Sequence, residues 1–331
     1  MINTNNSNLR SLAQKRKLAI GTGVSMEPLR DDPSYREVLM REYNMVTPTY
    51  IMKFEPLQPQ RHHYNFEAAD NFVAIAKANQ MQVRGHNLVW HHSVPWWLTH
   101  GQWTKEELIH ILRQHIHTVV GHYRGQLAAW DVVNEAVADQ DSAGQRKRDT
   151  IWLRGIGPEY VELAFRWAHE ADPTVPLFYN DYAGEGLGAK SDAIYAMVKE
   201  LRQRDVPIHG IGFQMHVSIQ NPPKPEDIAA NMKRLGELGL QVQVTEMDVK
   251  IHDGSGTQEE RVAAQTKVYR DILQVCLEAP NCTAFLTWEF ADHHSWIPDF
   301  FGKPDSPLPF DESYRPKAAY HAMVEVLKID S

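Results

Sequence analysis

The segment Leu127-Ala-Ala-Trp-Asp-Val-Val-Asn-Glu-Ala136 is a largely apolar run of strand length that ends in a polar cluster. It is followed, at residues 158–170, by an amphipathic segment of helix length. A strand that is apolar on both faces is typical of a parallel sheet covered by helices. The segment therefore predicts one strand–helix unit of an α/β fold.

The same alternation continues in both directions along the chain. Seven further runs of strand length fall at residues 18–24, 45–50, 83–90, 175–181, 208–216, 241–249 and 282–290. The helical segments that follow them fall at residues 34–43, 66–79, 104–124, 189–204, 225–238, 259–278 and 317–328. In the third of these helical segments, Thr104 and Glu107 have the spacing of a capping box, which predicts that a helix begins there.

Eight strand–helix units in 331 residues average about 41 residues each. This count predicts the α/β class and a (β/α)8 TIM barrel, with residues 1–331 as a single domain and residues 1–17 as a polar N-terminal leader. A doubly wound open sheet is the alternative, but it needs a glycine-rich turn after the first strand. The turn Gly21-Thr-Gly-Val-Ser-Met26 lacks the third glycine of that motif.

The composition argues against several classes of partner. Lys and Arg number 34 against 42 Asp and Glu, a formal net charge of −8, so we expect no nucleic-acid or anionic-membrane partner. No apolar run reaches the roughly 20 residues of a membrane span. Residues 1–17 contain no apolar stretch that could act as a signal sequence, which predicts a cytoplasmic protein. A secreted protein in its processed form would look the same.

The cysteines and the paired histidines bear on disulfides and metal sites. Cys276 and Cys282 each lie beside an apolar segment, which favours buried free thiols, although a disulfide in an oxidising compartment remains open. The neighbouring histidines in His91-His92 and His293-His294 point to opposite faces of an extended chain, so each pair offers one ligand to a common centre. We therefore expect neither a metal nor a cofactor.

Two glutamates stand at the carboxyl ends of predicted strands, where TIM barrels carry their chemistry. Glu135 ends the fourth strand, and Glu246 lies in the Thr-Glu-Met-Asp cluster of the seventh. Two carboxyl groups that converge across the barrel mouth can cleave a glycosidic bond, one as acid and one as nucleophile. Each of them alone could equally cap a strand or pair with an arginine.

Other strand ends add groups suited to binding sugars. The segments Arg84-Gly-His-Asn-Leu-Val-Trp-His-His92, Gly212-Phe-Gln-Met-His216 and Trp288-Glu-Phe-Ala-Asp-His-His-Ser-Trp296 combine tryptophans with amides and histidines. Tryptophan faces stack on sugar rings, and amides and histidines bind hydroxyl groups. Taken with the two glutamates, these residues predict a saccharide-binding cleft.

These motifs resemble glycoside hydrolase family 10, the retaining endo-β-1,4-xylanases built on a (β/α)8 barrel. The resemblance covers residues 18–327. It rests on Met52-Lys-Phe-Glu55, on the three segments just quoted, on Trp130-Asp-Val-Val-Asn-Glu-Ala136 and Thr245-Glu-Met-Asp248, and on the closing Leu308-Pro-Phe-Asp311 and Tyr314-Arg-Pro-Lys317. The spacing of Cys276 and Cys282 resembles a pair that is disulfide-bonded in secreted members. The lack of a signal sequence suggests an intracellular bacterial member.

The resemblance implies a role for each site residue. Glu135 would be the general acid/base and Glu246 the nucleophile of a double displacement, with the carboxyl groups about 5–5.5 Å apart. Asp248 would support the nucleophile. The residues expected to bind substrate are Lys53, His86, Trp90, Asn134, Tyr182, Gln214, His216, Trp288 and Trp296.

The chain departs from the family pattern at two places. Thr49-Tyr50 stands where the family usually has Glu-Asn, which binds the second glycone sugar, and Ser93 stands where it usually has a glutamine. We therefore expect a hydrolase acting on xylan or xylo-oligosaccharides, with altered binding of the distal sugar. A β-xylosidase-like enzyme on short or aryl xylosides is the first alternative. An inactive saccharide-binding barrel is a more remote one, because both glutamates are present.

Overall fold

The computed structural model describes residues 8–139 and 147–328, and its strands follow the predicted apolar runs. They are β1 (Ala19–Val24), β2 (Met45–Pro48), β3 (Gln82–Val89), β4 (Ala129–Asn134), β5 (Leu177–Asp181), β6 (Gly210–Phe213), β7 (His216–Ser218), β8 (Gln241–Lys250) and β9 (Cys282–Thr287). The helices are α1 (Leu9–Lys15), α2 (Met26–Asp31), α3 (Pro33–Glu42), α4 (Phe54–Leu57), α5 (Glu67–Ala78), α6 (Trp96–Thr99), α7 (Lys105–His122), α8 (Ile151–Gly155), α9 (Tyr160–Ala171), α10 (Ala189–Gln203), α11 (Pro225–Glu237), α12 (Gln258–Glu278), α13 (Ile297–Phe301) and α14 (Ala318–Lys328), with a 3₁₀ turn η1 (Asp292–His294).

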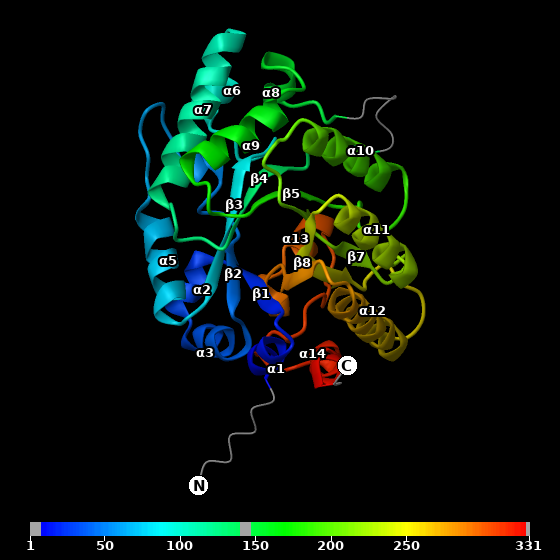
Figure 1. Ribbon diagram of the computed structural model, residues 1–331. Helices are drawn as coiled ribbons and strands as arrows, with labels where there is room; N and C mark the ends of the chain where they lie inside the picture. The colour runs from blue at the N-terminus through cyan, green and yellow to red at the C-terminus, as the bar shows by residue number, and fades with distance from the viewer. Residues whose placement is uncertain (1–7, 140–146, 329–331) are drawn as a thin grey trace.

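The strands form a closed parallel barrel surrounded by helices (Figure 1). They pair in the order β6-β5-β4-β3-β2-β1-β9-β8, and β6 also pairs with β8, which closes the sheet on itself. The short β7 pairs only with the far end of β8, so it extends β6 rather than adding a position to the barrel. The predicted (β/α)8 barrel is confirmed.

The interior of the barrel changes from apolar to polar along its axis. Met45, Ala284 and Leu286 form a small separate cluster of buried side chains. Beyond it lies a buried polar layer in which Arg84 donates to Asp131 at 3.0 Å and to Gln243 at 2.5 Å. The apolar side chains on the outer face of the strands pack instead against the helices. The polar layer directs hydrogen-bonding groups toward one end of the barrel.

Glycines allow two close approaches in this barrel. On the outer face, a Cβ at Gly85 would lie 2.3 Å from the ring of Trp130, so only glycine leaves room for that indole. Inside, a Cβ at Gly212 would lie 2.1 Å from Oδ1 of Asn180. The missing side chain at Gly212 therefore makes the space in which the Asn180 amide sits.

The helix boundaries bear out one local prediction and correct two others. Thr104 and Glu107 form the predicted capping box at the start of α7. Residues 9–15, expected to belong to a polar leader, instead form α1, whose buried face is Leu9, Leu12 and Ala13. The polar and charged residues around these apolar positions hide the helical spacing in the sequence. Residues 1–7 lie outside the described part of the chain. The run 208–216, expected to be one strand, is interrupted between β6 and β7.

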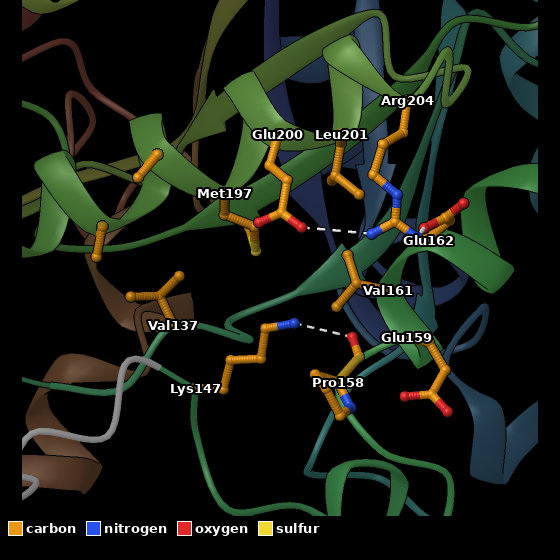
Figure 2. Close-up of a pocket in the computed structure, with 12 residues that line it drawn as sticks. Val137, Lys147, Pro158, Glu159, Val161, Glu162, Met197, Glu200, Leu201 and Arg204 are labelled. Atoms are coloured by element: carbon orange, nitrogen blue, oxygen red, sulfur yellow. Dashed lines mark hydrogen bonds and ion pairs between the residues drawn. The ribbon is translucent and has the colours of Figure 1, made fainter.

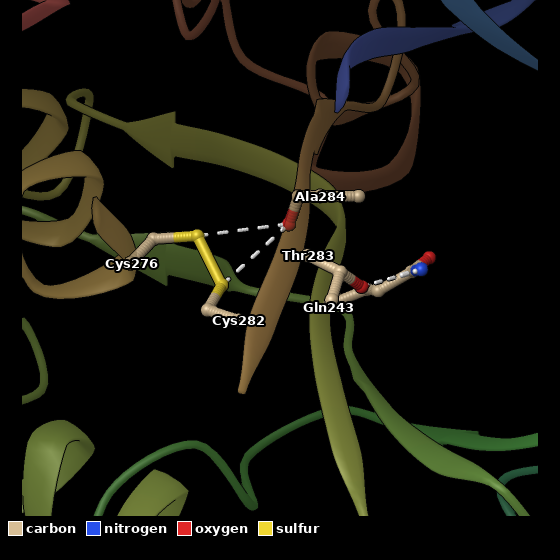
Figure 3. The surroundings of a disulfide bond; sticks show 5 residues. All are labelled: Gln243, Cys276, Cys282, Thr283 and Ala284. Atoms are coloured by element: carbon tan, nitrogen blue, oxygen red, sulfur yellow. Dashed lines mark hydrogen bonds between the residues drawn. A yellow bond between two sulfur atoms is a disulfide. The ribbon is translucent and has the colours of Figure 1, made fainter. Parts of the chain in front are cut away.

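A disulfide joins Cys276, near the end of α12, to Cys282, at the start of β9 (Figure 3). The two Cα atoms are 5.3 Å apart. The favoured interpretation of the isolated residues as free thiols was therefore wrong, because the helix end and the strand start meet across a short turn. The disulfide agrees with what the family resemblance implied.

We expect the Cys276→Ser, Cys282→Ser double variant to have a free energy of unfolding about 2 kcal/mol lower than the oxidised protein. The disulfide closes a short loop, and the entropy that such a loop removes from the unfolded chain is of this size. Urea unfolding of both proteins, with and without a reductant, measures the difference. Equal midpoints for the oxidised and the double-variant proteins would contradict the expectation.

Candidate active site

The two predicted catalytic glutamates lie at the carboxyl end of the barrel, on strands that are not neighbours. Glu135 directly follows β4 and has a φ of +57°, a left-handed conformation that is uncommon for a residue with a side chain. Glu246 lies within β8. Both are buried, with exposed fractions of 8% and 5%. Carboxyl groups removed from water in this way have pKa values that depend strongly on their neighbours.

A chain of side-chain amides connects the two carboxyl groups. Asn180 Nδ2 donates to Glu246 Oε1 at 2.7 Å and to Asn134 Oδ1 at 2.8 Å. Gln214 Nε2 donates to the same Asn134 oxygen at 3.2 Å and to Glu135 Oε1 at 2.9 Å. The amides therefore hold both carboxyl groups around one site. Asn134 and Gln214 were predicted site residues, whereas Asn180 was not, although it lies one residue before the end of the fifth apolar run.

On the other side of Glu246, His216 lies between two carboxylates. Its Nε2 is 3.2 Å from Glu246 Oε2, and its Nδ1 is 2.8 Å from Asp248 Oδ2. Trp296 Nε1 donates to the same Asp248 oxygen at 2.8 Å. Burial lowers the pKa of His216, but the charges and hydrogen bonds of Asp248 and Glu246 raise it by more, so the pKa lies well above its ordinary value. His216 is therefore held as a cation.

The predicted nucleophile is kept ionised by its neighbours. Burial raises the pKa of Glu246, but the charge of His86 and the hydrogen bond and charge of His216 lower it by more. The pKa consequently lies below the ordinary value of a glutamate. An ionised carboxylate is the form that can attack a sugar carbon.

The ring of His86 is held by Asp131, which forms a buried ion pair with Arg84. Neither Asp131 nor Arg84 was among the predicted site residues. The Nδ1 atom of His86 is 3.0 Å from Asp131 Oδ2 and 3.9 Å from Glu246 Oε1. Asp131 also pairs with the guanidinium of Arg84, which is fully buried. This network of Arg84, Asp131 and His86 places charged groups directly beneath Glu246.

Two tryptophans and a lysine surround the carboxyl groups. Trp90 Nε1 donates to Glu135 Oε2 at 2.9 Å, and Lys53 Nζ lies 4.7 Å from the centre of the Trp90 ring. Burial lowers the pKa of Lys53, while the charges of Glu246 and Glu135 oppose that shift. The Trp288 ring lies edge-on to His86, with the ring centres 5.2 Å apart. These residues were predicted to bind substrate, and all of them lie around the same site.

Tyr182 lies beyond Glu135 and is held by charged groups. Its hydroxyl donates to Asp139 at 2.7 Å and accepts from Arg148 Nη2 at 2.8 Å. The ammonium of Lys190 lies 3.5 Å from the centre of the ring and covers one face. Arg148 Nε also donates to the backbone carbonyl of Glu135 at 2.9 Å. The guanidinium of Arg148 also lies 5.6 Å from the centre of this ring, so Arg148 ties the position of Tyr182 to that of Glu135.

The three residues that depart from the family pattern, Thr49, Tyr50 and Ser93, contact neighbouring residues of the protein. The Thr49 hydroxyl lies 3.0 Å from that of Ser25. Tyr50 is half exposed, and its hydroxyl lies 3.5 Å from Glu55 Oε2. The carbonyl of Ser93 accepts a hydrogen bond from the backbone N–H of Glu55 at 2.9 Å. Neither Thr49 nor Tyr50 brings a charged group to the site.

The described residues contain no group of three or more His, Cys, Asp or Glu side chains arranged to hold a metal ion. Burial and the neighbouring charges of His92 and Arg148 lower the pKa of His91 to about 3, so this histidine is neutral.

Within residues 8–139 and 147–328, no helix combines the length and the apolar character that crossing a membrane requires.

A separate cavity of about 370 Å³ lies outside the barrel, between α9 and α10 (Figure 2). Its walls are apolar, and charged groups surround its mouth; Lys147 Nζ there donates to the carbonyl of Pro158 at 2.8 Å. None of the predicted site residues lines it. The cavity is therefore not part of the candidate active site.

The family model described as glycosyl hydrolase family 10 matches residues 8–326. The chain belongs to this family. Among the family 10 relatives, endo-1,4-beta-xylanase B of Thermotoga neapolitana is 46% identical over 322 residues, which cover 97% of this chain and 91% of that protein. The beta-1,4-xylanase of Dictyoglomus thermophilum is 39% identical over 303 residues, covering 88% and 84% of the two chains.

A solved structure agrees with the fold. Xylanase 10B from Thermotoga petrophila RKU-1, in complex with xylobiose, superposes on this family 10 chain with a TM-score of 0.92 at 44% identity, and 97% of each chain is covered. The barrel and the family predicted from the sequence are thereby confirmed. The roles of individual site residues stay predictions, which the experiments below address.

The environment of Glu246 leads to a prediction for the pH dependence of activity. If Glu246 is the nucleophile that the resemblance implies, activity is expected to require its ionised form and to be lost as the pH falls through its pKa. His216→Ala removes a hydrogen bond and a charge that lower this pKa, so the acid limb of the kcat/KM profile is expected to move to higher pH. The matched control is His252→Ala, which breaks another His–Asp pair, with Asp305, and should leave the limb in place. An unmoved acid limb in His216→Ala would contradict the prediction.

Proposed function

We propose that the protein is a retaining endo-1,4-β-xylanase, a glycoside hydrolase that cleaves β-1,4-xylosidic bonds in xylan or xylo-oligosaccharides. The observation that carries the proposal is the pair of buried glutamates, Glu135 and Glu246, joined by amides around one site. The relatives described above, which match most of the chain, are named as xylanases, and one is solved with xylobiose. A retaining mechanism is general to family 10.

In the first step of the proposed reaction, the Glu246 carboxylate attacks the anomeric carbon. The bond from that carbon to the leaving oxygen breaks, and Glu135 gives its proton to the oxygen. In the second step, Glu135 takes a proton from water, which attacks the same carbon and releases Glu246. Two inversions restore the original anomeric configuration.

The amides assist this reaction at the proposed transition state. Asn134 is held by Asn180 and Gln214, so its own amide is fixed before a substrate binds. We expect it to bind the 2-hydroxyl of the sugar under attack. Such a bond strengthens as charge develops on the ring, and it therefore accelerates the chemical step rather than only binding the substrate.

The finer specificity follows from Thr49 and Tyr50. Because their side chains carry no charge and the Thr49 hydroxyl already contacts Ser25, the second glycone sugar is expected to gain little binding energy here. The protein is then expected to act well on short xylo-oligosaccharides and aryl xylosides. A β-xylosidase-like preference is the second candidate, favoured by the same two residues.

A length series from xylobiose to xylohexaose tests both statements. We expect products released from internal bonds, identified by mass, and only a small gain in kcat/KM, within about tenfold, when a second glycone sugar is added, since about 1.4 kcal/mol corresponds to tenfold. Release of xylose alone from one chain end would favour the β-xylosidase-like candidate. A gain well above tenfold would contradict the expected weak distal site, and no cleavage at any length would contradict the proposed function.

The cellular location is a separate proposal. The sequence predicted a cytoplasmic, intracellular bacterial protein. The disulfide between Cys276 and Cys282 is more typical of oxidising compartments, so it favours the secreted alternative. Thiol labelling of the protein in fractions of its native cells distinguishes the two locations.

A further inference from the structure

The backbone between β6 and β7 makes a turn at Met215, between two predicted site residues. Met215 has a φ of +65°, in the left-handed region that residues with a side chain seldom occupy. Its two neighbours in sequence, Gln214 and His216, contact Glu135 and Glu246, respectively. A shift of this turn would therefore disturb both proposed catalytic carboxyl groups together.

A buried glutamate from another loop holds this turn. The N–H of Met215 donates to Glu185 Oε1 at 3.0 Å, and the N–H of Ala183 donates to the same oxygen at 3.1 Å. Glu185 lies in the loop between β5 and α10 and is 5% exposed. A buried N–H without an acceptor is strongly disfavoured, so the carboxyl oxygen stabilises the left-handed conformation of Met215.

Glu185 is itself fixed from the helical layer. Asn231, on α11, donates from Nδ2 to the carbonyls of Gly184 at 2.8 Å and Glu185 at 3.0 Å. Arg234 Nε donates to Asn231 Oδ1 at 2.8 Å and orients its amide. Asn231 therefore fixes the backbone of this loop from α11. Burial raises the pKa of Glu185, and the hydrogen bond from Met215 and the charges of His216 and Lys190 oppose this shift.

We propose that Glu185 is a positioning residue that fixes the turn at Met215, and through it holds Gln214 against Glu135 and His216 against Glu246. Glu185 touches neither of the two carboxyl groups nor, in the proposed mechanism, the sugar. The inference rests on the proposed function, because it concerns the placement of that function's acid/base and nucleophile.

Three variants test the role of the Glu185 oxygen. Glu185→Ala removes the acceptor, Glu185→Asp keeps a carboxyl group but withdraws the oxygen, and Glu185→Gln keeps an oxygen at the same reach. We expect kcat/KM on xylotriose to fall about 10- to 100-fold in the Ala and Asp variants, because a displacement of about 1 Å costs this much, and to be largely retained in Gln. The Asp variant keeps the test available if the Ala variant does not fold.

Two readouts separate positioning from a general loss of structure. His216 lowers the pKa of Glu246, so displacing His216 should let that pKa rise. The acid limb of the pH profile should then move to higher pH in the Ala and Asp variants. A displaced Gln214 disturbs Glu135, so the loss should be greater on xylotriose than on a dinitrophenyl xylobioside, whose leaving group needs no proton.

Asp172→Ala is the matched control. Asp172 is a buried carboxylate that also accepts backbone N–H groups, from Gly125 at 2.9 Å and Thr174 at 3.0 Å, but it precedes β5 at the opposite end of the barrel. The Asp172→Ala variant should be less stable than the wild-type protein, while the acid limb of its pH profile should stay in place. The same behaviour in Glu185→Asp, or activity in Glu185→Gln as low as in Glu185→Ala, would overturn the inference. Failure of the proposed function would appear separately, as a wild-type protein that cleaves no xylo-oligosaccharide.

Discussion

Replacing Glu246 by alanine is expected to lower kcat/KM on xylo-oligosaccharides by about 10⁴- to 10⁶-fold, the size of loss seen when a catalytic nucleophile is removed. Without this carboxylate, no covalent glycosyl-enzyme forms and the first step has no attacking group. The loss should be equally severe on an aryl xyloside, because a good leaving group does not replace a missing nucleophile. Release of nitrophenol and of reducing sugar measures both.

Azide tests the stereochemical role of Glu246. In Glu246→Ala, a small anion that occupies the place of the lost carboxylate should attack an activated β-xyloside once and give an α-xylosyl azide. The control is Glu42→Gln, which changes a buried glutamate on α3 that contacts Leu9 and Tyr320, far from the site in the fold. This control should keep wild-type activity. Substantial hydrolysis by Glu246→Ala without azide would remove Glu246 from the mechanism.

Glu135→Ala is expected to show a loss that depends on the leaving group. General acid catalysis contributes about 10²- to 10⁴-fold, and kcat/KM on xylo-oligosaccharides should fall by that factor. On a dinitrophenyl xylobioside, whose leaving group departs without a proton, the first step should be nearly unchanged. The glycosyl-enzyme should then accumulate, because no base activates water, and it is observable as a burst of phenol and by mass.

Azide should give the opposite stereochemical result in this variant. The anion replaces water in the second step of Glu135→Ala and attacks the glycosyl-enzyme, so the product is a β-xylosyl azide. An equal loss of activity on both kinds of substrate would show that Glu135 is not the acid. An α-azide from this variant would mean that the two roles are assigned the wrong way round.

Much of this site could be predicted from the polar residues at the carboxyl ends of the apolar runs. Parallel strands carry their carboxyl ends to one face of the barrel, so Glu135 and Glu246 were expected to converge although 111 positions separate them in the sequence. The expectation needed only the alternation of apolar runs with helices. The same rule brought Gln214, His216 and Trp288 to the site.

The groups that fix the site were harder to predict. Asn180 lies next to the last residue of β5. Neighbouring residues of a strand point to opposite faces, and nothing local showed whether Asn180 or Asp181 faced inward. Glu185 acts on a backbone N–H that lies 30 positions away, in the turn between β6 and β7. That turn was itself not predicted, because residues 208–216 have the length of one strand and contain neither proline nor a turn motif between Phe213 and His216. Such contacts depend on how loops meet in three dimensions.

The helix α1 has a consequence for how the protein could be re-engineered. It leads into the amino end of β1, it contacts α14, and its Leu9 N–H donates to Glu42 at 3.0 Å. Both ends of the described chain therefore emerge on the side of the barrel away from the catalytic mouth. A carbohydrate-binding module or a solid-support tether attached beyond α1 or α14 is therefore expected to leave the cleft open.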